Sequence, residues 1–193
     1  MASKIKYHGK LKLDFKKIFN IIKRKDTRIE KTVDSTRPNF FLNRGKKELE
    51  FHKNIARWYT KDIQVFYRHT NKKLRDTLPK NFWKRFNLDY DTVRVQVMRH
   101  TPGRVSIPHV DKYNSFLTGI NQTNSDSKRK KIKRIWITLT EPQMGHVLLV
   151  GDEVAYNLPK GTALEFPSDV IHSGGNIGYV DRYVMTVTGW DNG

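Results

Sequence analysis

The hydrophobic residues of this chain change their spacing about half-way along it. In the first half they recur every three or four positions, as on one face of a helix. Asp14 is placed to cap a helix over residues 14–24, a second helix is expected over residues 46–60, and a third near Pro79, where a missing N–H is tolerated. The apolar faces of these helices are Phe15, Ile18, Phe19 and Ile22; Phe51, Ile55, Trp58 and Tyr59; and Leu78, Phe82 and Phe86.

From Val93 onward apolar and polar residues alternate in short runs, which is the spacing of strands. The runs end at glycine, proline or aspartate, and a polar stretch over residues 118–133 interrupts them. We expect this stretch to be a loop able to close over a site. The runs occupy residues 93–98, 105–111, 134–139, 147–150, 154–158, 163–166 and 182–190, with another that ends at His172. Short strands with regular turns are typical of a sandwich or jelly roll.

The length of 193 residues fits one domain with a full hydrophobic core. We predict a mainly β core over residues 91–193 and a basic, mainly helical N-terminal region over residues 1–90 whose helices pack on that core. No apolar run approaches the roughly 20 residues that cross a bilayer, so we expect no membrane association and a cytoplasmic protein. The chain has no cysteine, and any metal ligands must be histidines or carboxylates.

The net charge of +18 is concentrated in the first half of the chain. Residues 1–90 hold 25 Lys and Arg against 9 Asp and Glu, a net charge of +16, while residues 91–193 hold 12 against 10, a net charge of +2. This asymmetry favours attraction to a polyanion such as nucleic acid or a ribosomal surface. The alternative is a set of helices with solvated, lysine-rich faces.

Two strong metal ligands, His109 and Asp111, stand two residues apart in the run over residues 105–111. Both fall on the face of Val105, which points inward, and a shared metal ion would satisfy two buried polar groups at once. His172 can supply a third ligand. Two histidines and one carboxylate on one face of an iron ion are the ligand set of non-haem Fe(II) oxygenases.

Residues 93–190 resemble the Fe(II)/2-oxoglutarate-dependent dioxygenases, which share the order His-x-Asp, distal His, then Arg. The stretches 102–111, 134–139 and 150–153 resemble the aspartyl/asparaginyl β-hydroxylase branch, which includes free-proline hydroxylases. The resemblance covers about half of the chain and implies a double-stranded β-helix (a cupin-like jelly roll). Some members of this branch lack the carboxylate ligand, whereas Asp111 is present here.

The resemblance also implies a role for each site residue. His109, Asp111 and His172 would be the catalytic iron ligands, and Arg182 would bind the distal carboxylate of 2-oxoglutarate, as the planar guanidinium suits. Arg134 is a second candidate for contact with cosubstrate or substrate. The cofactors would be Fe(II), 2-oxoglutarate and O2, with ascorbate as a stimulating reductant, and hydroxylation is the expected outcome.

Three functions remain open from the sequence. The first is hydroxylation of a protein side chain or amino acid, for example in a ribosomal or nucleic-acid-binding protein. The second is oxidation of a nucleic acid base, although repair enzymes of this type carry a second arginine where this chain has Thr188. The third is a jelly roll without catalysis that serves as a binding module.

Overall fold

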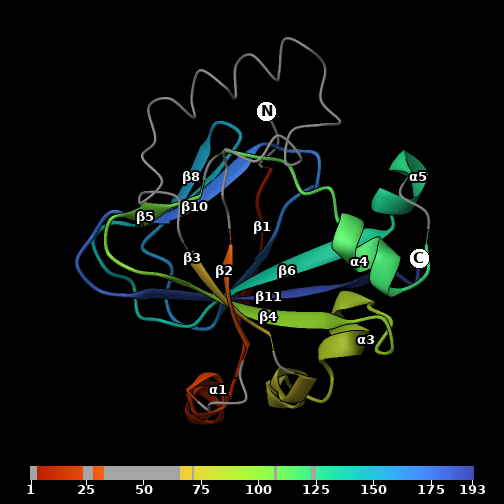
Figure 1. The fold of residues 1–193 in the computed structure, drawn as a ribbon, viewed down its shortest axis with the longest axis horizontal. Coiled ribbons are helices and arrows are strands. Elements are labelled where there is room, and N and C mark those ends of the chain that lie inside the picture. Colours follow the sequence, from red (N-terminus) through yellow and green to blue (C-terminus); the bar gives the residue numbers. More distant parts are fainter. Residues whose placement is uncertain (1–3, 24–27, 33–65, 71, 107, 123–124) are drawn as a thin grey trace.

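The computed structural model describes residues 4–23, 28–32, 66–70, 72–106, 108–122 and 125–193 (Figure 1). The predicted helix over residues 46–60, most of the connection before it, and Ile107 lie outside these residues. Within the described residues, no helix is long and apolar enough to cross a membrane.

The described residues form two antiparallel sheets. The large sheet has the order β1-β9-β6-β11-β4-β3-β2, and the small sheet has the order β5-β10-β7-β8. The strands of the large sheet are β1 (Lys6–Lys10), β2 (Arg28–Thr32), β3 (Phe66–Thr70), β4 (Arg94–His100), β6 (Ile132–Thr138), β9 (Thr162–Glu165) and β11 (Arg182–Trp190). Those of the small sheet are β5 (Arg104–Val105), β7 (His146–Val150), β8 (Glu153–Tyr156) and β10 (His172–Asn176).

From β4 to β11 the chain passes back and forth between the two sheets, which makes this part a double-stranded β-helix. The sheets enclose a core cluster that includes Met98, Leu148, Val150 and Leu164. The predicted fold class, mainly β with a double-stranded β-helix core, is therefore confirmed. The last strand has the predicted bounds, since β11 spans residues 182–190, and most of its residues are buried because it lies between β6 and β4.

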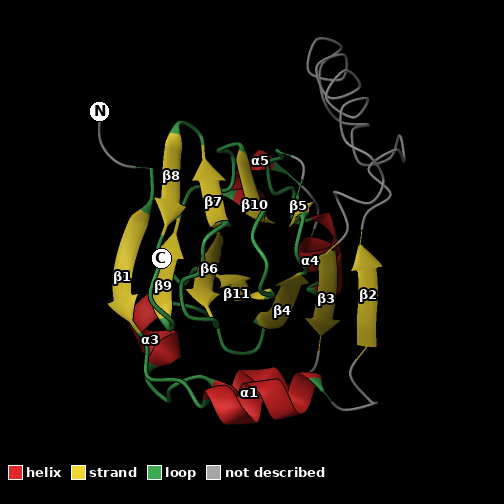
Figure 2. Ribbon diagram, turned by 90° about the vertical axis from the view of Figure 1, so that its left-hand side faces the viewer, coloured by secondary structure: helices red, strands yellow, loops and turns green. Residues whose placement is uncertain are grey.

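Helices cover the other face of the large sheet, so that the molecule has three layers (Figure 1). They are α1 (Phe15–Ile22), η2 (Lys72–Thr77) and α3 (Phe82–Phe86), and α1 runs across the bottom of Figure 2. Asp14 caps α1, since its Oδ1 accepts a hydrogen bond of 2.9 Å from the Lys17 backbone N–H. The apolar face of α1 joins a core cluster with Val97 and Met185 of the sheet, as the 3.6-residue spacing predicted.

The N-terminal region contributes strands as well as helices, which the sequence pattern did not predict. β1 pairs with β9 at one end of the large sheet, and β3 pairs with β4 at the other. Four of the five residues of β1 are exposed, so no alternation of apolar residues marks it in the sequence. Residues 1–90 therefore extend the large sheet in addition to covering it.

The stretch over residues 118–133 was predicted to be a loop, but it is not a loop throughout. It contains the end of α4 (Asn114–Gly119) and α5 (Asp126–Arg129). Phe116 and Leu117 anchor α4 by packing with Ile132 in a third core cluster. The polar composition hid these short helices, because α4 has a single turn of apolar residues and α5 has none.

A strand was predicted over residues 105–111, but β5 is shorter than this prediction and ends at Val105. In contrast, Gly174 and Gly175, which were predicted to lie between strands, belong to β10. A Cβ at Gly175 would lie 2.4 Å from Cγ1 of Val105 on the neighbouring strand. Glycine therefore allows the close approach of β5 and β10 at this point.

Candidate metal centre

The backbone brings the two predicted histidine ligands together across 63 residues of sequence. The N–H of His109 donates to the carbonyl of His172 at 3.0 Å, and the N–H of His172 donates to the carbonyl of His109 at 2.9 Å. This antiparallel bridge continues the pairing of β5 with β10 beyond the end of β5. These main-chain hydrogen bonds hold His109 and His172 side by side.

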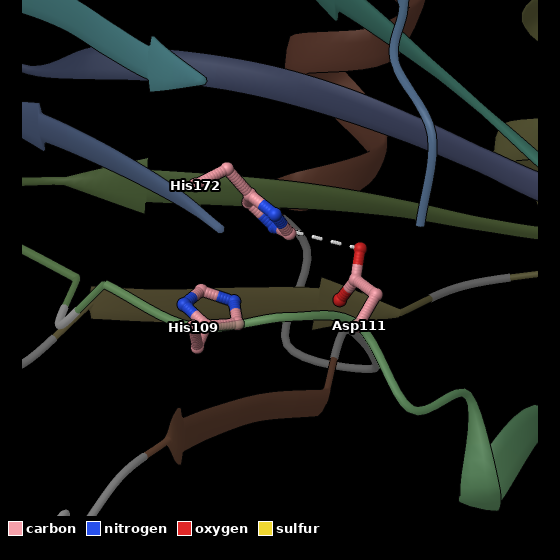
Figure 3. Close-up of side chains that lie close together, drawn as sticks. All are labelled: His109, Asp111 and His172. Atoms are coloured by element: carbon pink, nitrogen blue, oxygen red, sulfur yellow. Dashed lines mark ion pairs between the residues drawn. The ribbon is translucent and has the colours of Figure 1, made fainter. Parts of the chain in front are cut away.

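The side chains of His109, Asp111 and His172 converge on one point (Figure 3). One ligand atom from each lies within 4.8 Å of the others, so these three residues could hold a metal ion. His172 Nε2 is 3.6 Å from Asp111 Oδ2, which is the ion pair drawn in Figure 3. The His172 side chain is 1% exposed and that of Asp111 is 12% exposed, so the site is closed on one side and accessible near the carboxylate.

The hydrogen bond of His172 selects the nitrogen that is available to a metal. Nδ1 lies 3.0 Å from the carbonyl of Val170, and because a carbonyl only accepts, Nδ1 carries the proton. Nε2 then carries the lone pair, and this buried atom has no hydrogen-bond partner. An imidazole that donates through one nitrogen to a carbonyl and leaves the other directed at a carboxylate is the usual arrangement of a histidine metal ligand. The residues therefore fit a divalent metal ion.

The charges of the site suit a cation. Burial lowers the pKa of His172 to about 4, although Asp111 acts in the opposite direction. Burial also acts to raise the pKa of Asp111, but Arg134, His172 and His109 outweigh it and hold that pKa below its usual range. At neutral pH the imidazole is neutral and the carboxylate is ionised, which are the forms that bind metals.

Arg134 lies beside the candidate ligands and contacts one of them directly. Its Nη1 donates to Asp111 Oδ2 at 2.6 Å, and its Nε donates to Thr188 Oγ1 at 2.9 Å. The guanidinium also lies over the ring of Tyr113, 4.6 Å from its centroid. These contacts hold the carboxylate in place. The predicted contact of Arg134 with cosubstrate or substrate stays a prediction.

Arg182 is the first residue of β11, and its side chain lies inside the β-helix beside Gly174 of β10, the strand that begins at His172. Gly174 follows His172 by two residues on the same face of β10, about 7 Å along the strand, and a Cβ at Gly174 would lie 3.3 Å from Arg182 Nη1. The side chain is buried, and burial lowers the pKa of Arg182 to about 10. The Arg182 Nη1 lies 3.4 Å from Nδ1 of His100, and among the described residues no carboxylate pairs with Arg182.

A cavity of about 20 Å³ adjoins Arg182, between Thr138, His146 and Val184. This volume holds about one water molecule and is too small for a five-carbon dicarboxylate.

Two aromatic residues that the sequence did not single out surround His172. The ring of Phe166 lies 4.8 Å from the imidazole between centroids, and the ring of Trp136 lies 6.0 Å from it. The indole Nε1 of Trp136 is buried without a hydrogen-bond partner. The period of two could have identified Trp136, because it follows Arg134 by two residues on β6 and shares its face.

No protein-family model matches the sequence, and no curated protein matches it either. Solved structures with a similar arrangement include two cupin-2 proteins. One, from Rhodopseudomonas palustris, is 7% identical with a TM-score of 0.45, over 85% of this chain and 72% of that one. The other, from Rhodospirillum rubrum, is 8% identical with a TM-score of 0.44, over 86% and 71%.

A predicted oxalate decarboxylase from Thermotoga maritima is 13% identical, with a TM-score of 0.38 over 65% of this chain and 81% of that one. At these TM-scores the fold is assigned from the strand order of this chain itself, and the resemblance to 2-oxoglutarate oxygenases remains a prediction. The described residues thus form a double-stranded β-helix that brings two histidines and one aspartate into a single site able to hold a metal ion.

Proposed function

We propose that this protein is an Fe(II)- and 2-oxoglutarate-dependent oxygenase that hydroxylates a protein side chain or an amino acid. The observation that carries the proposal is the grouping of His109, Asp111 and His172, with the unpartnered Nε2 of His172 directed at the carboxylate. Three protein ligands of this kind are the facial triad of non-haem Fe(II) oxygenases, which leaves coordination positions open.

A second observation supports the choice of cosubstrate. Arg182 is a buried cation that has no carboxylate partner among the described residues. A buried charge without a counter-charge is costly, so this position favours an anionic ligand. The distal carboxylate of 2-oxoglutarate, bound by the guanidinium in a bidentate manner, would supply that charge.

When bound, Fe(II) would bring 2-oxoglutarate and O2 to react, so that one oxygen atom enters succinate as CO2 leaves and the other enters the substrate as a hydroxyl group. The residues of the chain supply the positions. His172 is held in one tautomer by the carbonyl of Val170, and Asp111 is held by Arg134. Phe166 and Trp136 pack around His172 and exclude water from that side of the site.

The test is Fe(II) binding by calorimetry under anaerobic conditions, followed by conversion of 2-oxoglutarate to succinate in the presence of ascorbate. We expect the unmodified protein to bind one Fe(II), and His172→Ala and Asp111→Ala to bind it at least about 100-fold more weakly and to form no succinate. His8→Gln is the matched control, because His8 pairs with Glu165 and lies outside the triad. Absence of iron binding by the unmodified protein, or equal binding by all variants, would exclude the proposed function.

A further inference from the structure

Two buried side-chain nitrogens have no hydrogen-bond partner among the described residues, and they belong to neighbouring side chains. One is Nε2 of His172, the candidate metal ligand, and the other is Nε1 of Trp136. The indole is nearly perpendicular to the imidazole, with 6.0 Å between the ring centroids, and Trp136 is 6% exposed. A buried donor without an acceptor is destabilising, so a ligand that supplies an acceptor is expected at Trp136.

The two nitrogens need different partners. Nε2 of His172 carries a lone pair, because Nδ1 donates to the carbonyl of Val170, and it can therefore bind a metal ion. An indole N–H only donates, so Trp136 cannot bind a metal and needs an acceptor such as an oxygen atom. A ligand with an oxygen atom beside the metal centre would satisfy the indole, while the metal would satisfy the imidazole.

The inner face of the large sheet is polar next to Trp136. Thr186 of β11 lies directly opposite Trp136 in the strand pairing and is 2% exposed, and Thr188 on the same face is also buried. The alternate residues Met185 and Val187 belong instead to the core cluster under the helices. Beside Trp136, β11 therefore turns its apolar side chains to the helices and two hydroxyl groups to the interior of the β-helix, which suits a polar ligand there.

The charges on this inner face favour an anion as that ligand. Arg182 and Thr186 share the inner face of β11, and among the described residues no carboxylate pairs with Arg182. Arg134, two residues before Trp136 on β6, is already neutralised by Asp111. Hydrogen bonds to an ionised acceptor are stronger than those to a neutral one, so a carboxylate is the acceptor that suits the indole best.

We infer that the indole N–H of Trp136 donates a hydrogen bond to a carboxylate of the ligand bound at the candidate metal centre. The inference rests on the proposed function where it identifies that ligand as 2-oxoglutarate, whereas the donor itself requires only a carboxylate. Trp136 is then a binding residue as well as a packing partner of His172. A phenylalanine in its place could pack against the imidazole but could not donate.

The test follows the indole N–H signals by NMR in isotopically labelled protein loaded with Zn(II), which is diamagnetic and does not react with O2. Comparison with Trp136→Phe identifies the Trp136 signal among those of the four tryptophans. We expect 2-oxoglutarate to shift this signal to higher proton frequency and to slow its exchange with D2O, because a hydrogen bond forms. Pyruvate, which keeps the carboxylate next to the keto group, should also shift the signal. Dimethyl 2-oxoglutarate, which has no carboxylate, should leave it unchanged.

Affinity for 2-oxoglutarate provides a second measurement on the Zn(II)-loaded protein. Trp136→Phe should weaken binding by at least about tenfold, since a hydrogen bond to a charged group is lost, and should leave the affinity for Zn(II) unchanged. Trp83→Phe is the matched control, because it makes the same change in α3, on the helical side of the large sheet. It should alter neither affinity.

An unchanged Trp136 signal with both acids would overturn the inference, since water or an aromatic ring would then be the acceptor. An equal shift with the ester, or an equal loss of affinity in the two variants, would overturn it as well. Iron binding and succinate formation are measured separately. A Trp136 shift in a protein that forms no succinate would overturn the proposed function and leave this inference standing, whereas succinate formation with an unchanged Trp136 signal would do the reverse.

Discussion

At the scale of single residues, Arg134 connects the candidate ligand Asp111 to the central strand of the large sheet. Its Nη1 contacts the carboxylate and its Nε contacts Thr188 of β11, so one guanidinium fixes the carboxylate relative to the sheet. Partners of this kind orient metal ligands, and their loss costs about 10- to 100-fold in metal affinity. Arg134 is therefore a positioning residue in this structure.

We predict that Arg134→Gln lowers the affinity for Fe(II) by about tenfold and destabilises the iron-free protein by about 2 kcal/mol, because Asp111 loses its ion-pair partner. Arg134→Lys should keep part of the stability, since it retains the charge, but should not restore the metal affinity because one amine cannot make both contacts. Calorimetry and urea unfolding measure the two effects. Tighter iron binding by Arg134→Gln would mean instead that Arg134 competes with the metal for the carboxylate.

The buried His100 leads to a second prediction at this scale, which concerns the stability of the protein below neutral pH. Burial, Arg182 and His146 lower the pKa of His100 from 6.5 to about 3. Between these two values the unfolded chain binds a proton that the folded protein does not, so stability is full above pH 6.5 and is lost as the pH falls toward 3. The expected slope from this one group is about 1.4 kcal/mol per pH unit.

Urea unfolding at several pH values in EDTA measures this slope. His100→Asn, which keeps a polar side chain beside Arg182 but cannot titrate, should reduce the slope by about one proton. An unchanged slope in this variant would show that His100 does not account for the acid sensitivity.

His109 and Asp111 were predictable as a pair because they stand two residues apart in an alternating run and share one face, whereas the place of His172 beside them depends on pairing between distant segments. The hydrogen bond between Arg134 and Thr188 was not predictable, because it depends on which residue of β6 lies opposite Thr188 of β11. Strand register is set by packing of the whole sheet, and the sequence of one strand does not contain it.

At the scale of elements, two turns of the small sheet are held together by glycine. The N–H of Ile177 donates to the carbonyl of Gly145 at 2.9 Å, which joins the turn after β10 to the turn before β7. A Cβ at Gly178 would lie 1.9 Å from the carbonyl oxygen of Met144. The backbone must move to admit any side chain there.

We predict that Gly178→Ala destabilises the protein by about 3 kcal/mol, because the two turns must separate. Gly103→Ala is the control: Gly103 also lies in a turn, at φ +75°, but a Cβ there meets no atom within 4 Å. Only backbone strain remains at that position, at a cost of about 1 kcal/mol. Equal losses in the two variants, measured by urea unfolding, would contradict the packing argument.

The elements that alternate strongly were predictable from the sequence, and those that do not were missed. β6 and β11 lie between other strands with one face on each core cluster, so apolar residues recur along both and mark them as strands. β1 is an exposed edge strand and α5 is a single turn of polar residues, so neither has an apolar pattern. Their formation depends on pairing and packing with distant residues.

At the scale of the whole molecule, positive charge is in excess in residues 1–90, which hold 25 Lys and Arg against 9 Asp and Glu. We propose that this region attracts a polyanion without regard to sequence. If about six phosphates are contacted, affinity for duplex DNA should fall by about a thousandfold between 50 and 200 mM salt. Anisotropy with a labelled duplex measures this. A flat salt dependence would leave the lysines of this region as a solvated surface.

The order of strands in the large sheet has a consequence for how the protein is made. β11 follows the other described strands along the chain, yet it lies in the middle of the sheet, between β6 and β4. Until it leaves the ribosome, β9 and β6 on one side and β4 and β3 on the other present open edges that can pair with other chains. A chain stopped before Arg182 would keep the edges of β6 and β4 open, so it should aggregate more readily than a chain that contains β11.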